Sequence, residues 1–225
     1  ALLDVIEPLI KEISLESILV EILLVGNYDQ GRSSDKTPLV VKDLARRYPS
    51  LVRAIVYPKE GMMGWDMRSG LDVSRGAVIA VIDGDGQMPT ADILKCYRIL
   101  IARGCDLVKT FRAQRHDGLW RMLLSSWYNI VFKLFFPQVR SRDVNSKPKV
   151  FSRELFEKLR LCSDDWFIDA EIMIEASRIG ARIIEIETVF RRHENRRSFV
   201  SFVTVGEFIL NMVRYRMRRH EHFRK

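Results

Sequence analysis

The first half of the chain alternates continuous apolar runs with segments of helical periodicity. Apolar runs predict strands at Ile18–Val25, Leu51–Tyr57, Ala77–Ile82 and Asp106–Thr110. Helical spacing predicts helices at residues 1–17, Lys36–Arg47, Met63–Ser74 and Ala91–Arg103. Strands that are apolar throughout are buried on both faces, so this pattern predicts an α/β domain with a mostly parallel sheet flanked by helices. Ligands of such sheets bind beyond the carboxyl ends of the strands.

The second half has a different pattern, with longer amphipathic segments. The predicted elements are a helix at Leu119–Phe136 before Pro137, a polar loop at Gln138–Lys149, helices at Arg153–Arg160 and Phe167–Ile179, a strand at Arg182–Phe190 and a last helix at Phe202–Arg218. The last helix places its apolar side chains on one face. We expect one domain over residues 1–199 and an amphipathic helix with a basic tail over residues 200–225.

The start of the chain is unusual, because residues 1–17 predict a helix with no strand before it. A sheet of this type usually begins with a strand. We therefore expect the first strand to be missing, which would leave a gap or an open edge in the sheet.

The charge of the chain indicates a polyanionic partner. With 225 residues, 47% of them hydrophobic, the chain can bury one substantial core, and its formal net charge is +8. Nucleic acid, an anionic membrane and phosphorylated substrates are the partners that such a charge favours. The three cysteines form no disulfide or zinc pattern and predict reduced thiols in the cytosol. No run of about 18 uncharged apolar residues is present.

The strongest chemical signal follows the predicted strand Ala77–Ile82. Asp83 and Asp85 stand two residues apart, so an extended chain presents both carboxylates to one point, with Gln87 close behind. Carboxylate and amide oxygens suit Mg²⁺ or Mn²⁺ and leave positions open for phosphate oxygens. The alternative is an ordinary polar turn, since Asp-Gly is a common turn dipeptide. The position after a buried strand favours the site for a metal ion and a diphosphate.

Four stretches in this order resemble family 2 glycosyltransferases, of the branch that includes dolichol-phosphate mannose synthase and other polyprenyl-phosphate glycosyltransferases. They are Glu21–Thr37, Gly64–Gln87, the basic Arg112 and Arg115 after the fourth strand, and Asp165–Gly180. The resemblance implies a GT-A fold, which is Rossmann-like, with inversion at the transferred sugar.

The resemblance also implies roles for single residues. Asp83, Asp85 and Gln87 would hold the metal ion, and Asn27, Asp29, Asp83, Asp85 and Arg112 would bind the donor. Asp85, Asp169 and Glu171 would be catalytic, although acids near a helix start are also favoured by the helix dipole. Met62 and Met63 stand where many relatives carry a Gly-Lys pair, so a lysine for the donor phosphates is missing there.

Basic residues in the second half are candidates for the acceptor phosphate. The resemblance places this role on Arg115, Lys147, Lys149, Arg191 and Arg192, and the alternative is a set of solvated surface loops. The aromatic helix, residues 118–137, and the basic terminal helix are typical of helices at a membrane interface. Burial in the core is the other interpretation of the aromatic helix.

These observations predict a metal-dependent glycosyltransferase that moves a sugar from a nucleotide sugar, such as GDP-mannose or a UDP-sugar, to a polyprenyl or dolichyl phosphate. It would work as a peripheral protein at the cytoplasmic face of an anionic membrane, without nucleic acid. The alternatives are a family 2 enzyme acting on a sugar hydroxyl or another soluble acceptor, a sugar nucleotidyltransferase and a basic membrane-binding module. Nucleic-acid binding is disfavoured because the aromatic residues lie in apolar helices, not on a polar strand face.

Overall fold

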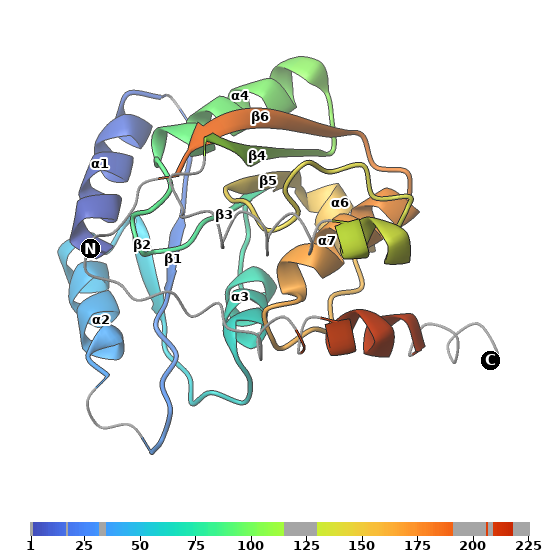
Figure 1. Cartoon of the computed structure of the whole chain (residues 1–225). Helices are drawn as coiled ribbons and strands as arrows, with labels where there is room; N and C mark the ends of the chain where they lie inside the picture. The colour runs from blue at the N-terminus through green and yellow to red at the C-terminus, as the bar shows by residue number, and fades with distance from the viewer. Residues whose placement is uncertain are drawn as a thin grey trace.

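The computed structural model describes residues 2–16, 18–31, 35–114, 130–190, 206 and 209–217 (Figure 1). Its elements are, in order, α1 (Leu2–Ser14), β1 (Ile22–Val25), α2 (Thr37–Arg47), β2 (Val52–Ile55), α3 (Met63–Asp72), β3 (Val78–Val81), α4 (Ala91–Arg103), β4 (Leu107–Gln114), β5 (Lys149–Ser152), α6 (Arg153–Lys158), α7 (Ile168–Arg178) and β6 (Ile183–Val189). Residues 130–135 and 209–217 are also helical. The predicted α/β class is confirmed.

In the described part of the chain, the strands form two sheets. β1 and β2 pair in parallel, and the second sheet has the order β3-β5-β4-β6. In this sheet β3, β4 and β6 run in one direction, and the short β5 between β3 and β4 runs in the opposite direction. The sequence pattern does not predict β5, because two lysines and a proline, Lys147 to Lys149, mark its start as a polar loop.

Helices cover both faces of the larger sheet. Neighbouring residues of a strand point to opposite faces. Val108 and Val150 pack against Cys96 and Leu100 of α4, which lies above the sheet in Figure 1. Leu107 and Phe151 face the other way, into the largest core cluster, to which α7 contributes six fully buried apolar side chains: Ile168, Ala170, Ile172, Met173, Ile174 and Ala176.

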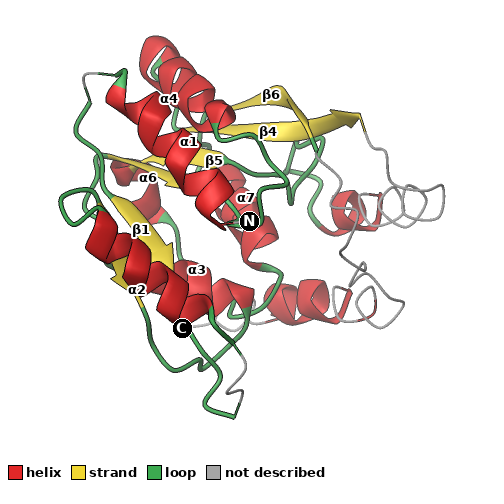
Figure 2. Cartoon of the chain, turned by 90° about the vertical axis from the view of Figure 1, so that its left-hand side faces the viewer, coloured by secondary structure: helices red, strands yellow, loops and turns green. Residues whose placement is uncertain are grey.

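The smaller sheet has its own core. Ile22, Leu24 and Val52 pack against apolar side chains of α1 and α2. Figure 2 shows these two helices on the side that faces the viewer, with α1 between α2 and α4. Within the described residues, β1 pairs only with β2 and β3 pairs only with β5. The expectation of a missing first strand stays a prediction.

Several predicted boundaries shift. β1 begins at Ile22, four residues later than predicted, and β4 continues to Gln114. Of the predicted helix Leu119–Phe136, the structure describes residues 130–136, and Phe132 and Phe136 at its end are buried in the core. Met212 of the terminal helix is also fully buried. Among the described residues, no helix has both the length and the apolar character needed to cross a membrane.

Candidate functional site

A cleft of about 590 Å³ opens beside the carboxyl ends of β1, β2 and β3. The described residues that line it are Asp29, Lys59, Gly61, Met62, Met63, Asp66, Asp83, Asp85 and Trp166. Both aspartates of the predicted metal motif therefore face the same cavity. This is the edge at which ligands of parallel α/β sheets bind.

The turn after β3 holds the two carboxylates in place. Asp85 Oδ1 accepts a hydrogen bond from the backbone N–H of Gln87 at 3.1 Å. This bond between the aspartate side chain and the backbone two residues later stabilises the turn. Gly86 has a φ of 74°, a conformation that suits glycine because it lacks a Cβ atom. The Asp-Gly-Asp-Gly sequence is therefore a structured turn at the cleft.

The charges in the cleft suit a divalent cation. Four aspartates and one lysine are among its described lining residues, and Lys59 pairs with Asp66 at 2.7 Å. A nucleoside diphosphate would be repelled by this negative surplus unless a cation neutralised part of it. Asp83 and Asp85 offer the hard oxygen ligands that Mg²⁺ and Mn²⁺ prefer. When bound, such an ion would act as a Lewis acid on the leaving diphosphate. The assignment of Asp83, Asp85 and Gln87 as ligands stays a prediction.

The two predicted donor contacts in the first loop, Asn27 and Asp29, lie in different surroundings. Asp29 is exposed and lines the cleft. Asn27 is buried: its Oδ1 accepts the Tyr57 N–H at 2.8 Å, and its Nδ2 lies 2.9 Å from both Asp66 Oδ1 and Ser69 Oγ. Asn27 thus positions Asp66 in the cleft wall and does not line the cleft itself.

The position of Lys147 follows from the register of β5. Val81, the last residue of β3, is the antiparallel partner of Lys149. Continuing this register by two residues beyond the strand places Asp83 opposite Lys147. The Lys147 ammonium lies 2.6 Å from Asp83 Oδ1 and is only 2% exposed. A cation of the predicted acceptor site and a carboxylate of the predicted metal site are therefore direct partners.

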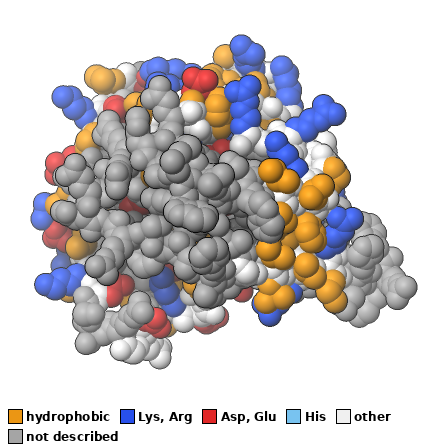
Figure 3. All heavy atoms as spheres, viewed as in Figure 1, with side chains coloured by type: hydrophobic (Ala, Val, Ile, Leu, Met, Phe, Trp, Pro, Cys, Tyr) orange, Lys and Arg blue, Asp and Glu red, His pale blue; other side chains and the backbone are white. Residues whose placement is uncertain are grey.

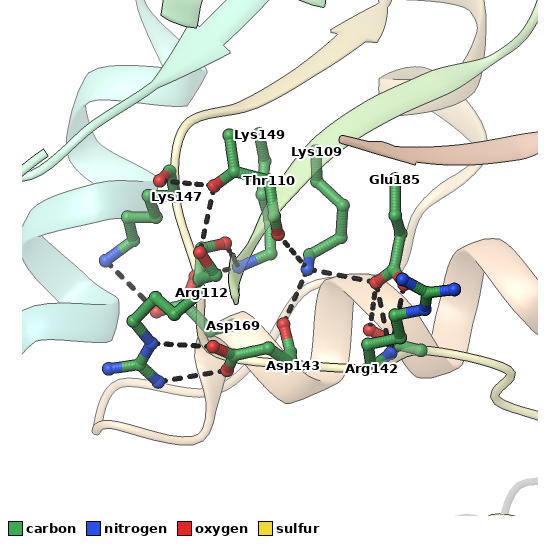
Figure 4. Close-up of polar contacts among 11 residues, drawn as sticks. Lys109, Thr110, Arg112, Arg142, Asp143, Lys147, Lys149, Asp169 and Glu185 are labelled. Carbon is green, nitrogen blue, oxygen red and sulfur yellow. Dashed lines mark hydrogen bonds and ion pairs between the residues drawn. The ribbon is translucent and has the colours of Figure 1, made fainter. Parts of the chain in front are cut away.

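Asp169 lies on the other side of this lysine. Its Oδ2 is 3.0 Å from Lys147 Nζ, and its Oδ1 is 2.5 Å from Lys149 Nζ, which also donates to the Ser146 carbonyl (Figure 4). Asp169, Lys147 and Lys149 are all buried. The first turn of α7, β5 and the turn after β3 are thus joined by one chain of ion pairs.

Burial and neighbouring charges set the pKa values in this chain. Burial raises the pKa of Asp169, but Lys147 and Lys149 outweigh this effect and leave it below its usual value. Burial lowers the pKa of Lys147, and Asp169 and Asp83 reverse the effect, so its net shift is upward. For Lys149, burial together with the nearby Lys109 and Lys147 outweighs Asp169 and lowers the pKa to about 8. At neutral pH Asp169 is therefore an anion between two ammonium groups.

Glu171 points away from this cluster. Its Oε2 accepts the backbone N–H groups of Cys162 and Ser163, and its Oε1 accepts from the Cys162 thiol. Burial raises the pKa of Glu171, and these hydrogen bonds limit the rise. The Glu171 carboxylate thus supports the loop that leads to Trp166. Glu171 is not among the described lining residues of the cleft, and its catalytic role stays a prediction.

A second polar network supports the loop before β5. Arg112 on β4 makes two hydrogen bonds to the Asp143 carboxylate, at 2.6 and 3.0 Å, and its guanidinium lies over the Phe190 ring. The buried Lys109 donates to the Asp143 carbonyl and lies 3.2 Å from Glu185 (Figure 4). Arg112 is thus placed in this network and is not among the described lining residues of the cleft. Its predicted donor contact stays a prediction.

Three predicted acceptor residues, Arg115, Arg191 and Arg192, lie outside the residues that the structure describes. Among the charged and aromatic residues that line the cleft, Lys59, Asp66 and Trp166 were not predicted. Lys59 follows β2 at the edge of the sheet where ligands bind, so its position in the sequence could have indicated a place in the cleft. Trp166 stands in a loop with no periodicity. Its place depends on Gly64, where a Cβ atom would lie 2.6 Å from the Asp165 carbonyl oxygen.

Comparisons with known proteins identify related sequences. A sequence model of the family described as Glycosyl transferase family 2 matches residues 2–160. The chain is 28% identical over 163 residues to dodecaprenyl-phosphate galacturonate synthase of Rhizobium johnstonii, covering 71% of this chain and 47% of the relative. It is 26% identical over 144 residues to undecaprenyl-phosphate 4-deoxy-4-formamido-L-arabinose transferase of Pseudomonas aeruginosa, covering 64% of this chain and 41% of the relative. The chain thus spans about half the length of the curated relatives it matches.

The fold also matches a solved structure. Glucosyl-3-phosphoglycerate synthase from Mycobacterium tuberculosis, in complex with Mn²⁺, UDP and glucosyl-3-phosphoglycerate, aligns with a TM-score of 0.66 at 17% identity, over 93% of this chain and 73% of that one. Because the family match covers well over half of the 225 residues, it is sufficient for assignment. The chain belongs to glycosyl transferase family 2.

Proposed function

We propose that the chain is the catalytic part of a metal-dependent, inverting glycosyltransferase that moves a sugar from a nucleotide sugar to a polyprenyl phosphate. The observation that supports binding of a nucleotide-sugar donor with a metal ion is the acidic cleft at the end of β3, which Asp83 and Asp85 both line. The names of the curated relatives, which act on dodecaprenyl and undecaprenyl phosphate, support the acceptor half. Mn²⁺ and UDP in the structural relative support a divalent ion.

The state of Asp169 favours a phosphate acceptor over a hydroxyl acceptor. A hydroxyl group has a very high pKa and needs a general base in hydrogen-bond reach, ideally one whose pKa lies near the working pH. Asp169 is the family's candidate for this role, yet two lysines hold its pKa below the usual range. A phosphate monoester, with a second pKa of about 6, is already an anion and needs cations to position it. Lys147, which pairs with the cleft residue Asp83, supplies such a cation, and the buried Lys149 lies behind it on Asp169.

Exposed apolar side chains on two neighbouring helices support action at a membrane. The helices at 130–135 and 209–217 are neighbours, because Arg216 donates to the Phe135 carbonyl and the Phe136 and Tyr215 rings are 6.0 Å apart. Four of their apolar side chains are exposed: Ile130, Leu134, Leu210 and Met217. Figure 3 shows hydrophobic side chains, with Lys and Arg among them, on the side where Figure 1 places these helices. We call these four residues the apolar patch. Apolar side chains with flanking cations suit an anionic interface.

A donor screen tests the proposal. The protein is incubated with single UDP- and GDP-sugars, with or without Mn²⁺ and a short polyprenyl phosphate, and released nucleoside diphosphate is measured. We expect release from one donor that requires both the metal ion and the prenyl phosphate. Release that a sugar hydroxyl stimulates and the prenyl phosphate does not would support the hydroxyl alternative. No release from any donor would contradict the enzyme assignment of this chain.

A further inference from the structure

Lys147 has two possible anionic partners, and only one of them faces the cleft. Its ammonium lies 2.6 Å from Asp83 Oδ1 and 3.0 Å from Asp169 Oδ2. Asp83 is 45% exposed in the cleft, whereas Asp169 is 4% exposed. Because the Lys147 ammonium contacts Asp83 Oδ1, a divalent ion bound to the same carboxylate would lie close to this ammonium, and at such separations like charges repel strongly.

We propose that Lys147 is a positioning residue that neutralises Asp83 when no metal ion is bound and withdraws to Asp169 when one binds. This inference rests on the proposed metal role of Asp83 and Asp85. Asp169 makes the exchange possible, because the ammonium keeps a buried carboxylate partner after it leaves Asp83. Leaving that lysine buried without any partner would be costly.

The exchange also links the two halves of the reaction. The N–H group that Lys147 directs at Asp83 becomes available for another anion only after the metal ion has taken the carboxylate. That anion is the acceptor phosphate, which Lys147 then helps to position. The metal ion therefore binds before the acceptor. The cation that offsets repulsion between donor and acceptor is not available before the metal ion is bound.

Direct binding of Mn²⁺ tests this role without reference to activity. Free Mn²⁺ is measured by electron paramagnetic resonance as the protein is titrated in the absence of nucleotide. Replacing Lys147→Met removes the competing cation, and we expect Mn²⁺ to bind about tenfold more tightly or better. Asp169→Asn removes the alternative partner, so Lys147 stays on Asp83 and Mn²⁺ should bind more weakly. Lys158→Met, a change at an exposed lysine paired with Glu154, is the control and should leave binding unchanged.

The signs of these changes separate the proposal from a merely structural role, because damage to the fold would weaken Mn²⁺ binding in both variants. Unchanged or weaker binding by Lys147→Met, in a protein whose Asp85→Asn variant has lost Mn²⁺, would overturn this inference alone. An Asp85→Asn variant that binds Mn²⁺ as tightly as the wild type would overturn the metal assignment and this inference with it.

A measurement on the wild-type protein avoids dependence on the folding of the variants. In protein labelled with ¹⁵N-lysine, the ammonium signal of buried Lys147 reports its partners. We expect Mg²⁺ to shift this signal in the wild type and not in Asp85→Asn. A Lys147 signal that stays in place while Mg²⁺ saturates the site would contradict the exchange.

Discussion

Asp169 and Lys149 form a fully buried ion pair, with the carboxylate Oδ1 at 2.5 Å from the ammonium nitrogen. The pair lies beneath Lys147, which takes the other oxygen of Asp169 and reaches Asp83 at the cleft. The two ammonium groups stabilise the ionised form of Asp169, so this carboxylate has little tendency to take a proton from an acceptor. This relationship decides how we expect the site to respond to substitution.

Replacing Asp169→Asn should therefore reduce kcat by less than tenfold at saturating Mn²⁺, although the free energy of unfolding should fall because two buried lysines lose their carboxylate. Removal of a true general base costs about 10²–10⁴-fold in rate. Lys147→Ala should raise the acceptor KM or lower kcat sharply. A large kcat loss for Asp169→Asn that higher pH rescues, together with an indifferent Lys147→Ala, would indicate a hydroxyl acceptor.

The pH dependence of stability should report Lys149. Its pKa of about 8 in the folded protein lies below the ordinary value of 10.5, so between these values the unfolded chain binds more protons than the folded one. Stability then rises with pH across this window. We expect the free energy of unfolding of the wild type, relative to Lys149→Met, to increase from pH 8 to pH 10.5 in urea titrations. A constant difference would show that Lys149 keeps its ordinary pKa. Lys158→Met is the matched control, because this lysine is exposed.

Asp85→Asn should nearly abolish transfer and leave the fold intact. The change removes one charge from a turn at the cleft and alters no core volume, so the thermal midpoint should stay close to that of the wild type. Asp72→Asn, at the exposed end of α3, is the control and should keep full activity. Near-normal turnover of Asp85→Asn at saturating donor would exclude its predicted role in metal binding.

The apolar patch should contribute to membrane binding. Leu134 is 74% exposed, and replacing Leu134→Ser together with Leu210→Ser should weaken partitioning into vesicles that contain anionic lipid. Leu39→Ser on α2 is the matched control, because this leucine is 68% exposed on a different part of the surface. If the double variant sediments with vesicles as well as the control does, the patch is not the membrane contact.

Local signals predicted the α/β class and the two aspartates at the cleft. An uninterrupted apolar strand that ends in Asp83-Gly-Asp85 fixes the direction of both carboxylates without knowledge of the rest of the fold. The contact between Lys147 and Asp83 could not be predicted in this way. It depends on the antiparallel register of β5, a four-residue strand that a polar, proline-containing segment introduces. The periodicity of the sequence likewise could not predict features that depend on tertiary partners. Examples are the burial of Asn27 and the orientation of Glu171 toward Cys162.

The identity of the product tests the central claim most directly. The protein is incubated with Mn²⁺, the donor that the screen identifies and a short polyprenyl phosphate, and the lipid fraction is analysed by mass spectrometry. We expect a lipid whose mass increases by one sugar residue, with the sugar joined through the phosphate and released by mild acid. Sugar found only on a hydroxyl group of a soluble acceptor, with the prenyl phosphate recovered unchanged, would contradict the account.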